Sequence, residues 1–325
     1  MKPGLTLALL LFASPAHAQD PSTGSGQAYP TKPIRLVVPY SPGGPVDIVG
    51  RLTALKLTDE FKQQVIVDNR AGGGGNIAVE IVAHSAPDGY TLLMGANGTN
   101  AINPGLYPKL AVDPAKELAP IGMVASSPMI LVVHPSVAAN SVKELVALAK
   151  AKPGTINFAS SGGGSTAHLS SELFKSMTGI NIVHIPYKGA GPALTDLVGG
   201  QVQIMFTGIS STLPYVKSGR LKPLAVSSEK RVPILPEVPT VNEEIAGYEV
   251  MTWYGVFAPA QLPRPIIVKL NQALAKIFTT PDARQRLAAL GAEPVTMSPE
   301  QFATAVGRET VKWAKVIKDS GARPE

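Results

Sequence analysis

Short apolar runs alternate along the chain with segments whose apolar residues recur at helical spacing. In the first hundred residues, three apolar runs at 34–40, 65–67 and 91–95 are separated by helical patterns at 46–58 and 76–85. Such an alternation of strands and helices is typical of a parallel sheet whose strands are joined by right-handed helical crossovers. We therefore expect the chain to begin its folded part with a β-α-β-α-β unit.

The same alternation returns in the second hundred residues and then gives way to a helical tail. Strands are predicted at 129–134, 156–159, 182–185, 202–206, 221–226 and 253–258, with helices at 141–150, 166–177 and 193–197. Three more helical segments follow at 263–278, 281–290 and 299–320. The repeat predicts an α/β fold built from two α/β domains rather than one.

No low-complexity linker separates the two blocks, so we expect ordered strands to connect them. The crossings are placed near 123–127 and 249–253. Domain 1 is then discontinuous and comprises 29–124 plus 252–325, whereas domain 2 comprises 125–251. The two domains would be joined by a hinge of two strands.

The N-terminus has a pattern of its own. Lys2 is followed by an apolar run at 5–13 and by Ser-Pro-Ala-His-Ala at 14–18. This pattern is typical of a secretory signal peptide, residues 1–18, cleaved near Ala18, and the run is shorter than the roughly 20 residues of a membrane span. Residues 19–28 are polar and rich in Gly and Ser, which predicts a flexible lead. We expect a protein exported to the periplasm.

Composition narrows the chemistry. The chain has no cysteine, which excludes zinc–thiolate sites, iron–sulfur clusters and cysteine nucleophiles. Its formal net charge is +6, but only 16% of residues are charged and the basic residues are scattered. A nucleic-acid binder would concentrate them in a stripe or patch, so we expect no nucleic-acid partner. A mild positive field suits a small anion.

Two glycine-rich loops carry most of the functional signal. One spans 40–47 and the other 160–168, and each follows a predicted strand and opens a predicted helix. Glycines allow an anion to approach the unpaired N–H groups of a helix N-terminus, where the helix dipole also favours negative charge. The alternative is that these glycines only make tight turns. Neither loop matches a nucleotide-binding pattern.

We expect the ligand to lie between the two loops, at the carboxyl ends of the parallel strands. The candidate ligand-binding residues are Tyr40, Ser41, Pro42, Gly43, Gly44, Asp47, Asn97, Thr99, Ser161, Gly162, Gly163, Ser165, His168, Tyr187, Lys188, Gly189, Thr207 and Gly208. For some of them a structural role is an equal or stronger interpretation. Asp47 would brace its loop, His168 would cap its helix, and Lys188 would be solvated. The loop at 72–75 is interpreted as cleft rim or plain turn.

The sequence offers little support for catalysis. Gly163-Gly-Ser165-Thr-Ala167 resembles a nucleophile elbow imperfectly, and no histidine lies beyond His184 to complete the chain order of that fold. There is no His-Glu-x-x-His motif for a metal. We therefore expect no catalytic residue, metal or cofactor, although hydrolysis through Ser165 stays open as an alternative.

Taken together, several motifs resemble the Bug receptors, which are the extracytoplasmic solute-binding proteins of tripartite tricarboxylate transporters. The resemblance spans the mature chain and rests on segments 29–34, 38–47, 67–76, 87–92, 162–168, 186–189 and 257–259. The loop at 71–75 departs from the usual Pro-Gly-Ala-Gly-Gly. The resemblance implies a periplasmic binding protein-like fold of type II that closes on its ligand, with ligand loops at 41–47 and 161–168.

The resulting hypothesis is a monomeric periplasmic receptor for a small organic anion. The ligand would be a mono- or dicarboxylate, aromatic ones included, and the resemblance implies delivery to two integral membrane permease subunits. A ligand-sensing partner of a membrane kinase would have the same fold and is the main alternative.

Overall fold

The computed structural model describes residues 29–324 together with Met1. The predicted signal peptide, 1–18, and the predicted lead, 19–28, lie outside the described residues apart from Met1 itself. Within the described part, no helix combines the length and apolar character that a membrane crossing requires.

The first half of the molecule is built on three parallel strands. β1 (Ile34–Val38) lies between β2 (Val65–Asn69) and β3 (Thr91–Ala96). The crossovers run through α1 (Pro45–Phe61) and α2 (Asn76–Ala83), as the alternation predicted. β9 (Met251–Pro259) extends this sheet antiparallel to β3, with Leu93 opposite Phe257.

The second half repeats the arrangement. β5 (Asn157–Ser160) lies between β6 (Val183–Pro186) and β7 (Ile204–Gly208), all parallel. Its helices are α5 (Val142–Ala151), α6 (Thr166–Thr178), α7 (Ala190–Val198) and α8 (Ile209–Lys217). Two further strands, β4 (Leu118–Val133) and β8 (Lys222–Val226), complete the sheet.

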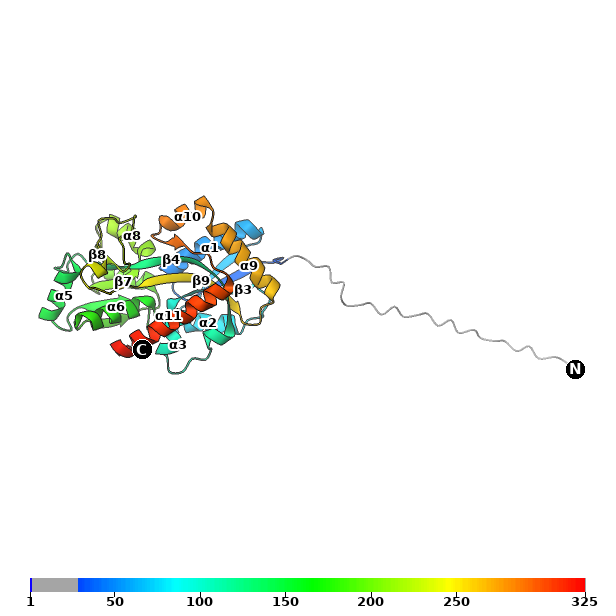
Figure 1. The fold of residues 1–325 in the computed structure, drawn as a ribbon, viewed down its shortest axis with the longest axis horizontal. Coiled ribbons are helices and arrows are strands. Elements are labelled where there is room, and N and C mark those ends of the chain that lie inside the picture. The colour runs from blue at the N-terminus through cyan, green and yellow to red at the C-terminus, as the bar shows by residue number, and fades with distance from the viewer. Residues whose placement is uncertain (2–28, 325) are drawn as a thin grey trace.

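Both halves therefore share one strand order. In the first half the order across the sheet is β2-β1-β3, followed by β9, which comes from the other half. In the second half the order is β6-β5-β7, followed by β4, which comes from the first half. Figure 1 shows β4 and β9 running side by side through the middle of the molecule. β4 pairs with β9 up to Pro128 and with β7 from Met129 onward, so the chain changes sheets between these residues. The domain boundaries proposed from the sequence stay predictions.

The remaining elements flank this frame. The predicted tail helices are α9 (Arg264–Phe278), α10 (Pro281–Ala288) and α11 (Pro299–Ser320). α11 begins with a capping box, packs against α6 of the second half, and buries Phe302 and Trp313 completely. The short elements are η1 (Gly73–Gly75), η2 (Gly98–Ile102), α3 (Asn103–Leu106), α4 (Pro114–Glu117), η3 (Val241–Glu243) and β10 (Glu293–Pro294).

Candidate functional site

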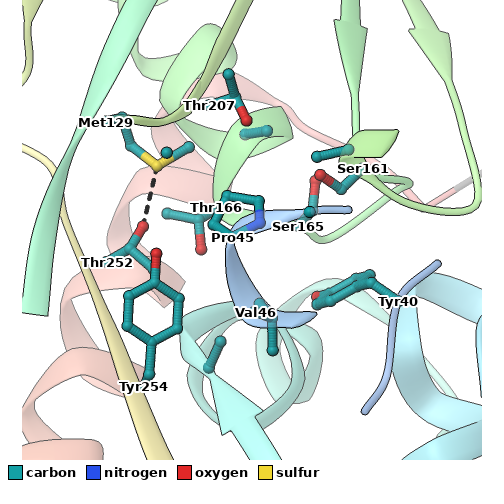
Figure 2. Close-up of a pocket in the computed structure, with 15 residues that line it drawn as sticks. Tyr40, Pro45, Val46, Met129, Ser161, Ser165, Thr166, Thr207, Thr252 and Tyr254 are labelled. Carbon is teal, nitrogen blue, oxygen red and sulfur yellow. Dashed lines mark hydrogen bonds between the residues drawn. The ribbon is translucent and has the colours of Figure 1, made fainter. Parts of the chain in front are cut away.

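A narrow cavity lies between the two halves, at the carboxyl ends of the parallel strands. It is lined by Tyr40, Gly44, Pro45, Val46, Ala96, Met129, Ser161, Ser165, Thr166, Ala167, Ala190, Thr207, Gly208, Thr252 and Tyr254, with a volume of about 40 Å³. We call it the inner cavity. Figure 2 shows side chains from both glycine loops and from β4 and β9 facing it.

Four helices begin at the inner cavity. The N-cap residues of α1, α6 and α8, which are Gly44, Ser165 and Gly208, line it, as does Ala190, the first residue of α7. The first N–H groups of a helix have no intrahelical acceptor and carry the positive end of the helix dipole. Four such ends converging on one space make it favourable for an anion.

Asp47 holds the first glycine loop in place from the side that faces away from the inner cavity. The Gly43 N–H donates to Asp47 Oδ2 at 2.9 Å, while Asn69 Nδ2 donates to Oδ1 at 2.9 Å and Arg51 Nε donates to Oδ2 at 3.0 Å. Burial acts to raise the pKa of Asp47, but these hydrogen bonds from Arg51, Gly43 and Asn69 outweigh it and hold the pKa below its usual value. Asp47 does not line the cavity; its side chain braces the loop.

The second glycine loop has its own contacts from behind. The Ser165 hydroxyl caps α6 by accepting the His168 N–H at 3.2 Å, and the Gly164 N–H donates to His168 Nδ1 at 3.2 Å. Gly162 and Gly164 have φ angles of +117° and +80°. A Cβ on Gly164 would lie 2.0 Å from Asn103 Oδ1, so this position requires glycine.

No Asp, Glu, Lys, Arg or His is among the residues that line the inner cavity. Its polar side chains are hydroxyls, and Thr207, only 1% exposed, points its hydroxyl toward the cavity in Figure 2. The wall at the β4–β9 crossing is formed by Met129, Thr252 and Tyr254, where the Thr252 hydroxyl donates to Met129 Sδ at 3.0 Å. Backbone N–H groups and hydroxyls are therefore the available donors for a ligand.

A wider outer cavity, about 660 Å³ in volume, adjoins the inner one through their shared residues Tyr40 and Ser161. It is also lined by Ser41, Gly72, Gly73, Gly74, Gly75, Tyr107, Gly162, Gly163, Pro186, Tyr187, Lys188 and Pro192. The glycines at 72–75 thus belong to the rim of the cleft. Lys188 is the one cation among the residues that line the two cavities.

Hydrogen bonds join the two halves across the cleft. The Ser41 N–H and hydroxyl both donate to the Lys188 carbonyl, at 3.1 and 2.9 Å. On the other side, the Tyr107 hydroxyl donates to the Gly163 carbonyl at 3.0 Å. Each glycine loop is therefore hydrogen-bonded to a segment of the opposite half.

The predicted site residues divide into three groups. Tyr40, Gly44, Ser161, Ser165, Thr207 and Gly208 line the inner cavity, and Ser41, Gly162, Gly163, Tyr187 and Lys188 line the outer one, with Tyr40 and Ser161 shared. Seven others line neither cavity: Pro42, Gly43, Asp47, Asn97, Thr99, His168 and Gly189. The other residues that line the inner cavity were not predicted from the sequence: Pro45, Val46, Ala96, Met129, Thr166, Ala167, Ala190, Thr252 and Tyr254.

Asn97 and Thr99, which follow the end of β3, are buried and make hydrogen bonds to other protein groups. Asn97 accepts the Trp253 N–H at 2.8 Å and donates to Glu309 Oε2 at 2.8 Å, which ties β9 to α11. The Thr99 hydroxyl bonds to Asn100 and to the backbone of Ala96.

Comparison with known proteins identifies the family. The model of the tripartite tricarboxylate transporter family receptor matches residues 49–322. Protein BugT of Bordetella pertussis is 38% identical over 303 residues, covering 92% of each chain. R. palustris Rpa4515, solved with adipate, has a TM-score of 0.90 at 37% identity, over 92% of this chain and 100% of that one. MatC from Rhodopseudomonas palustris, solved with bound malate, has a TM-score of 0.85 at 33% identity, covering 89% and 100%.

These matches confirm the predicted periplasmic binding protein-like fold and the resemblance stated from the motifs. They also bear on Ser165, because the matched family is one of non-catalytic receptors. In the structure the Ser165 hydroxyl accepts the His168 N–H and so caps α6. The chain belongs to the tripartite tricarboxylate transporter family of solute receptors.

Proposed function

We propose that this protein is a periplasmic receptor that captures a small carboxylate between its two halves. The single observation that carries the proposal is the convergence of four helix N-termini on a cavity without charged side chains. Such a site binds an anion through N–H groups and hydroxyls, without the tight ion pair that would slow ligand release. The buried Thr207 hydroxyl adds a donor that faces the cavity.

The proposed ligand is an organic mono- or dicarboxylate. Two structurally similar proteins were solved with adipate and with malate, which supports a carboxylate here as well. The outer cavity leaves room for a ligand body that extends past Tyr40 and Ser161. In this proposal the residues lining the two cavities bind the ligand, and Asp47 and His168 act through the loops that they brace.

The cellular part of the proposal follows from the N-terminal pattern and the family. The signal peptide predicted at 1–18 would direct the chain to the periplasm. There the receptor acts as a monomer and delivers its ligand to two integral membrane subunits of a tripartite transporter, as the family name implies.

Calorimetry with a matched ligand panel tests the proposal. Monocarboxylates, C4 to C8 dicarboxylates and aromatic carboxylates are titrated at pH 7.5, each beside its neutral amide. We expect at least one carboxylate to release heat and to raise the melting temperature while its amide does neither. A panel in which no carboxylate binds, or in which amides bind equally well, would contradict an anion site at the helix ends.

A further inference from the structure

Behind the second glycine loop lies a stack of three aromatic rings. The ring centroids of His168 and His184 are 4.1 Å apart and their planes differ by 6°, and Phe158 stacks on His184 at 4.7 Å. His168 is 3% exposed. This stack lines neither cavity, yet both imidazoles make hydrogen bonds that lead to the loop.

Each imidazole is connected to one loop glycine. His168 Nδ1 accepts the Gly164 N–H at 3.2 Å. The Ser160 hydroxyl accepts the Gly162 N–H at 3.1 Å and lies 2.6 Å from His184 Nε2. The Ser160 hydroxyl can donate its proton to His184 Nε2 when that ring is neutral and protonated at Nδ1. Gly164 is therefore anchored directly on an acceptor nitrogen, and Gly162 is anchored on Ser160, which bonds to the second imidazole.

The surroundings favour the neutral rings. Burial, together with Lys175, lowers the pKa of His168 to about 4. Burial, His168 and Lys175 lower that of His184 to about 3. Glu172 also faces the stack, with Oε1 4.0 Å from His168 Nε2, but it is paired with Lys175 at 2.8 Å. Both imidazoles therefore stay uncharged at neutral pH.

In the first glycine loop a glycine N–H also donates to the side chain four residues later, but the acceptor there is a carboxylate. Gly43 donates to Asp47, four residues later, just as Gly164 donates to His168, four residues later. Asp47 is negative, but Arg51 and Asn69 contact its oxygens and offset the charge. No Arg or Asn bonds to His168 among the contacts of the described residues. A carboxylate at that position would have only Lys175, already paired with Glu172, to offset its negative charge behind the anion site.

We propose that His168 and His184 are positioning residues that hold the second glycine loop for ligand binding by serving as neutral hydrogen-bond acceptors. This inference rests on the proposed function. Neither side chain touches the ligand. Their neutrality is part of the role, because the same loop shape held by an anion would repel a carboxylate ligand.

An isosteric pair of variants at one position tests this proposal. In His168→Asn, Oδ1 replaces Nδ1 as a neutral acceptor, and in His168→Asp a charged oxygen takes the same place. At pH 8 we expect Kd of His168→Asn for the best carboxylate of the panel to stay within about threefold of wild type. His168→Asp should bind about tenfold more weakly or worse. Equal Kd values for the Asn and Asp variants would overturn the requirement for neutrality.

Loss of the acceptor is tested separately. His168→Leu and His184→Leu remove it, whereas His184→Gln keeps an acceptor near the position of Nε2. We expect about tenfold weaker binding for both Leu variants and rescue by His184→Gln. His134→Leu, far from the loop beside Ser136, is the control and should bind like wild type. Wild-type Kd values in both Leu variants would overturn the bracing role.

Nuclear magnetic resonance on the wild-type protein without ligand tests the same proposal, so the result does not depend on whether a variant folds. The ¹⁵N shifts of the histidine rings report which nitrogen carries the proton. We expect His168 to be protonated at Nε2 only, and His184 at Nδ1 only, from pH 8 down to about 5. An imidazolium signal for either residue at pH 7 would overturn the proposal. A panel in which even wild type binds no carboxylate would instead count against the proposed function.

Discussion

At the scale of single residues, Asp47 offers a direct measure of what bracing a ligand loop contributes. We expect Asp47→Asn to lower the free energy of unfolding by about 1–3 kcal/mol, because at least one of the three partly buried N–H donors that bond to the carboxylate then faces the amide NH₂. Carboxylate affinity should fall as the loop at 41–44 loosens. Urea denaturation and calorimetry measure the two effects. Asp59→Asn, on an exposed position of the same helix, is the matched control and should change neither.

The buried histidines also make stability depend on pH. Their native pKa values, about 4 and about 3, lie below the ordinary value of 6.5. Between these values the unfolded chain binds protons that the native protein does not, so stability is complete above about pH 6.5 and declines as the pH falls toward 4. Urea denaturation between pH 7.5 and 4.5 should show a shallower decline for the double variant His168→Asn, His184→Gln. Parallel curves would show that these rings are not the source.

Many residues of the site could be predicted from the sequence, but the role of each one could not. It placed Asp47 and His168 beside the loops and left bracing and capping open for them, and the structure gives both side chains contacts behind the loops. It missed Met129 and Thr252 because the side of a strand that faces the cleft depends on how the sheets twist and pair. Tyr254 is both buried in the core and part of the cavity wall.

At the scale of elements, the start of α1 at Gly44 is a position where an added side chain would enter the inner cavity. A Cβ there would lie 3.3 Å from Ala190 Cβ, across the cleft at the start of α7. We expect Gly44→Val to abolish carboxylate binding while the fold persists, because the branched side chain fills the space between two helix N-termini. Calorimetry and circular dichroism check this. Gly307→Val is the control, since its Cβ would meet nothing within 4 Å. Unchanged affinity in folded Gly44→Val would move the site elsewhere.

Helix positions could be predicted from periodicity and caps, whereas some strands and turns could not. The sequence predicted a strand from 129, but β4 begins at Leu118. Pro120, Gly122 and Pro128 argue against a strand locally, and the pairing with β9 tolerates them through shifts in register near two of these positions. The π-helical turn at 98–102 was not predicted from the sequence, and Asn97 at its start is held by the distant Trp253 N–H.

At the scale of the whole molecule, the repeat in the sequence predicted two α/β units, but not how their strands are shared. β3 pairs with β9, whose residues lie about 160 positions later in the chain, with Leu93 opposite Phe257. No periodicity reports a contact between such distant segments. The crossings placed near 123–127 and 249–253 stay predictions. The exchange of strands explains why no flexible linker is needed, since β4 itself is the connection.

The contacts across the cleft imply that ligand binding and the relative position of the halves are coupled. Each half presents helix N-termini that repel one another electrostatically, and an anion between them offsets that repulsion. We therefore expect the two halves to separate without ligand and to close when a carboxylate binds, with Ser41–Lys188 and Tyr107–Gly163 hydrogen bonds forming on closure. Small-angle X-ray scattering should show a smaller radius of gyration when the best ligand is added.

Tyr107→Phe tests one closing contact, because it removes a hydroxyl that bonds across the cleft from the outer cavity. A neutral hydrogen bond contributes about 0.5–1.5 kcal/mol, so we expect roughly two- to tenfold weaker binding. Since the contact forms on closure, the loss should appear as faster dissociation in stopped-flow measurements, with association nearly unchanged. Tyr215→Phe, on α8 beside Arg220, is the control and should dissociate like wild type. A slower association rate with unchanged dissociation would mean that Tyr107 meets Gly163 before the ligand enters, and that the halves do not separate there.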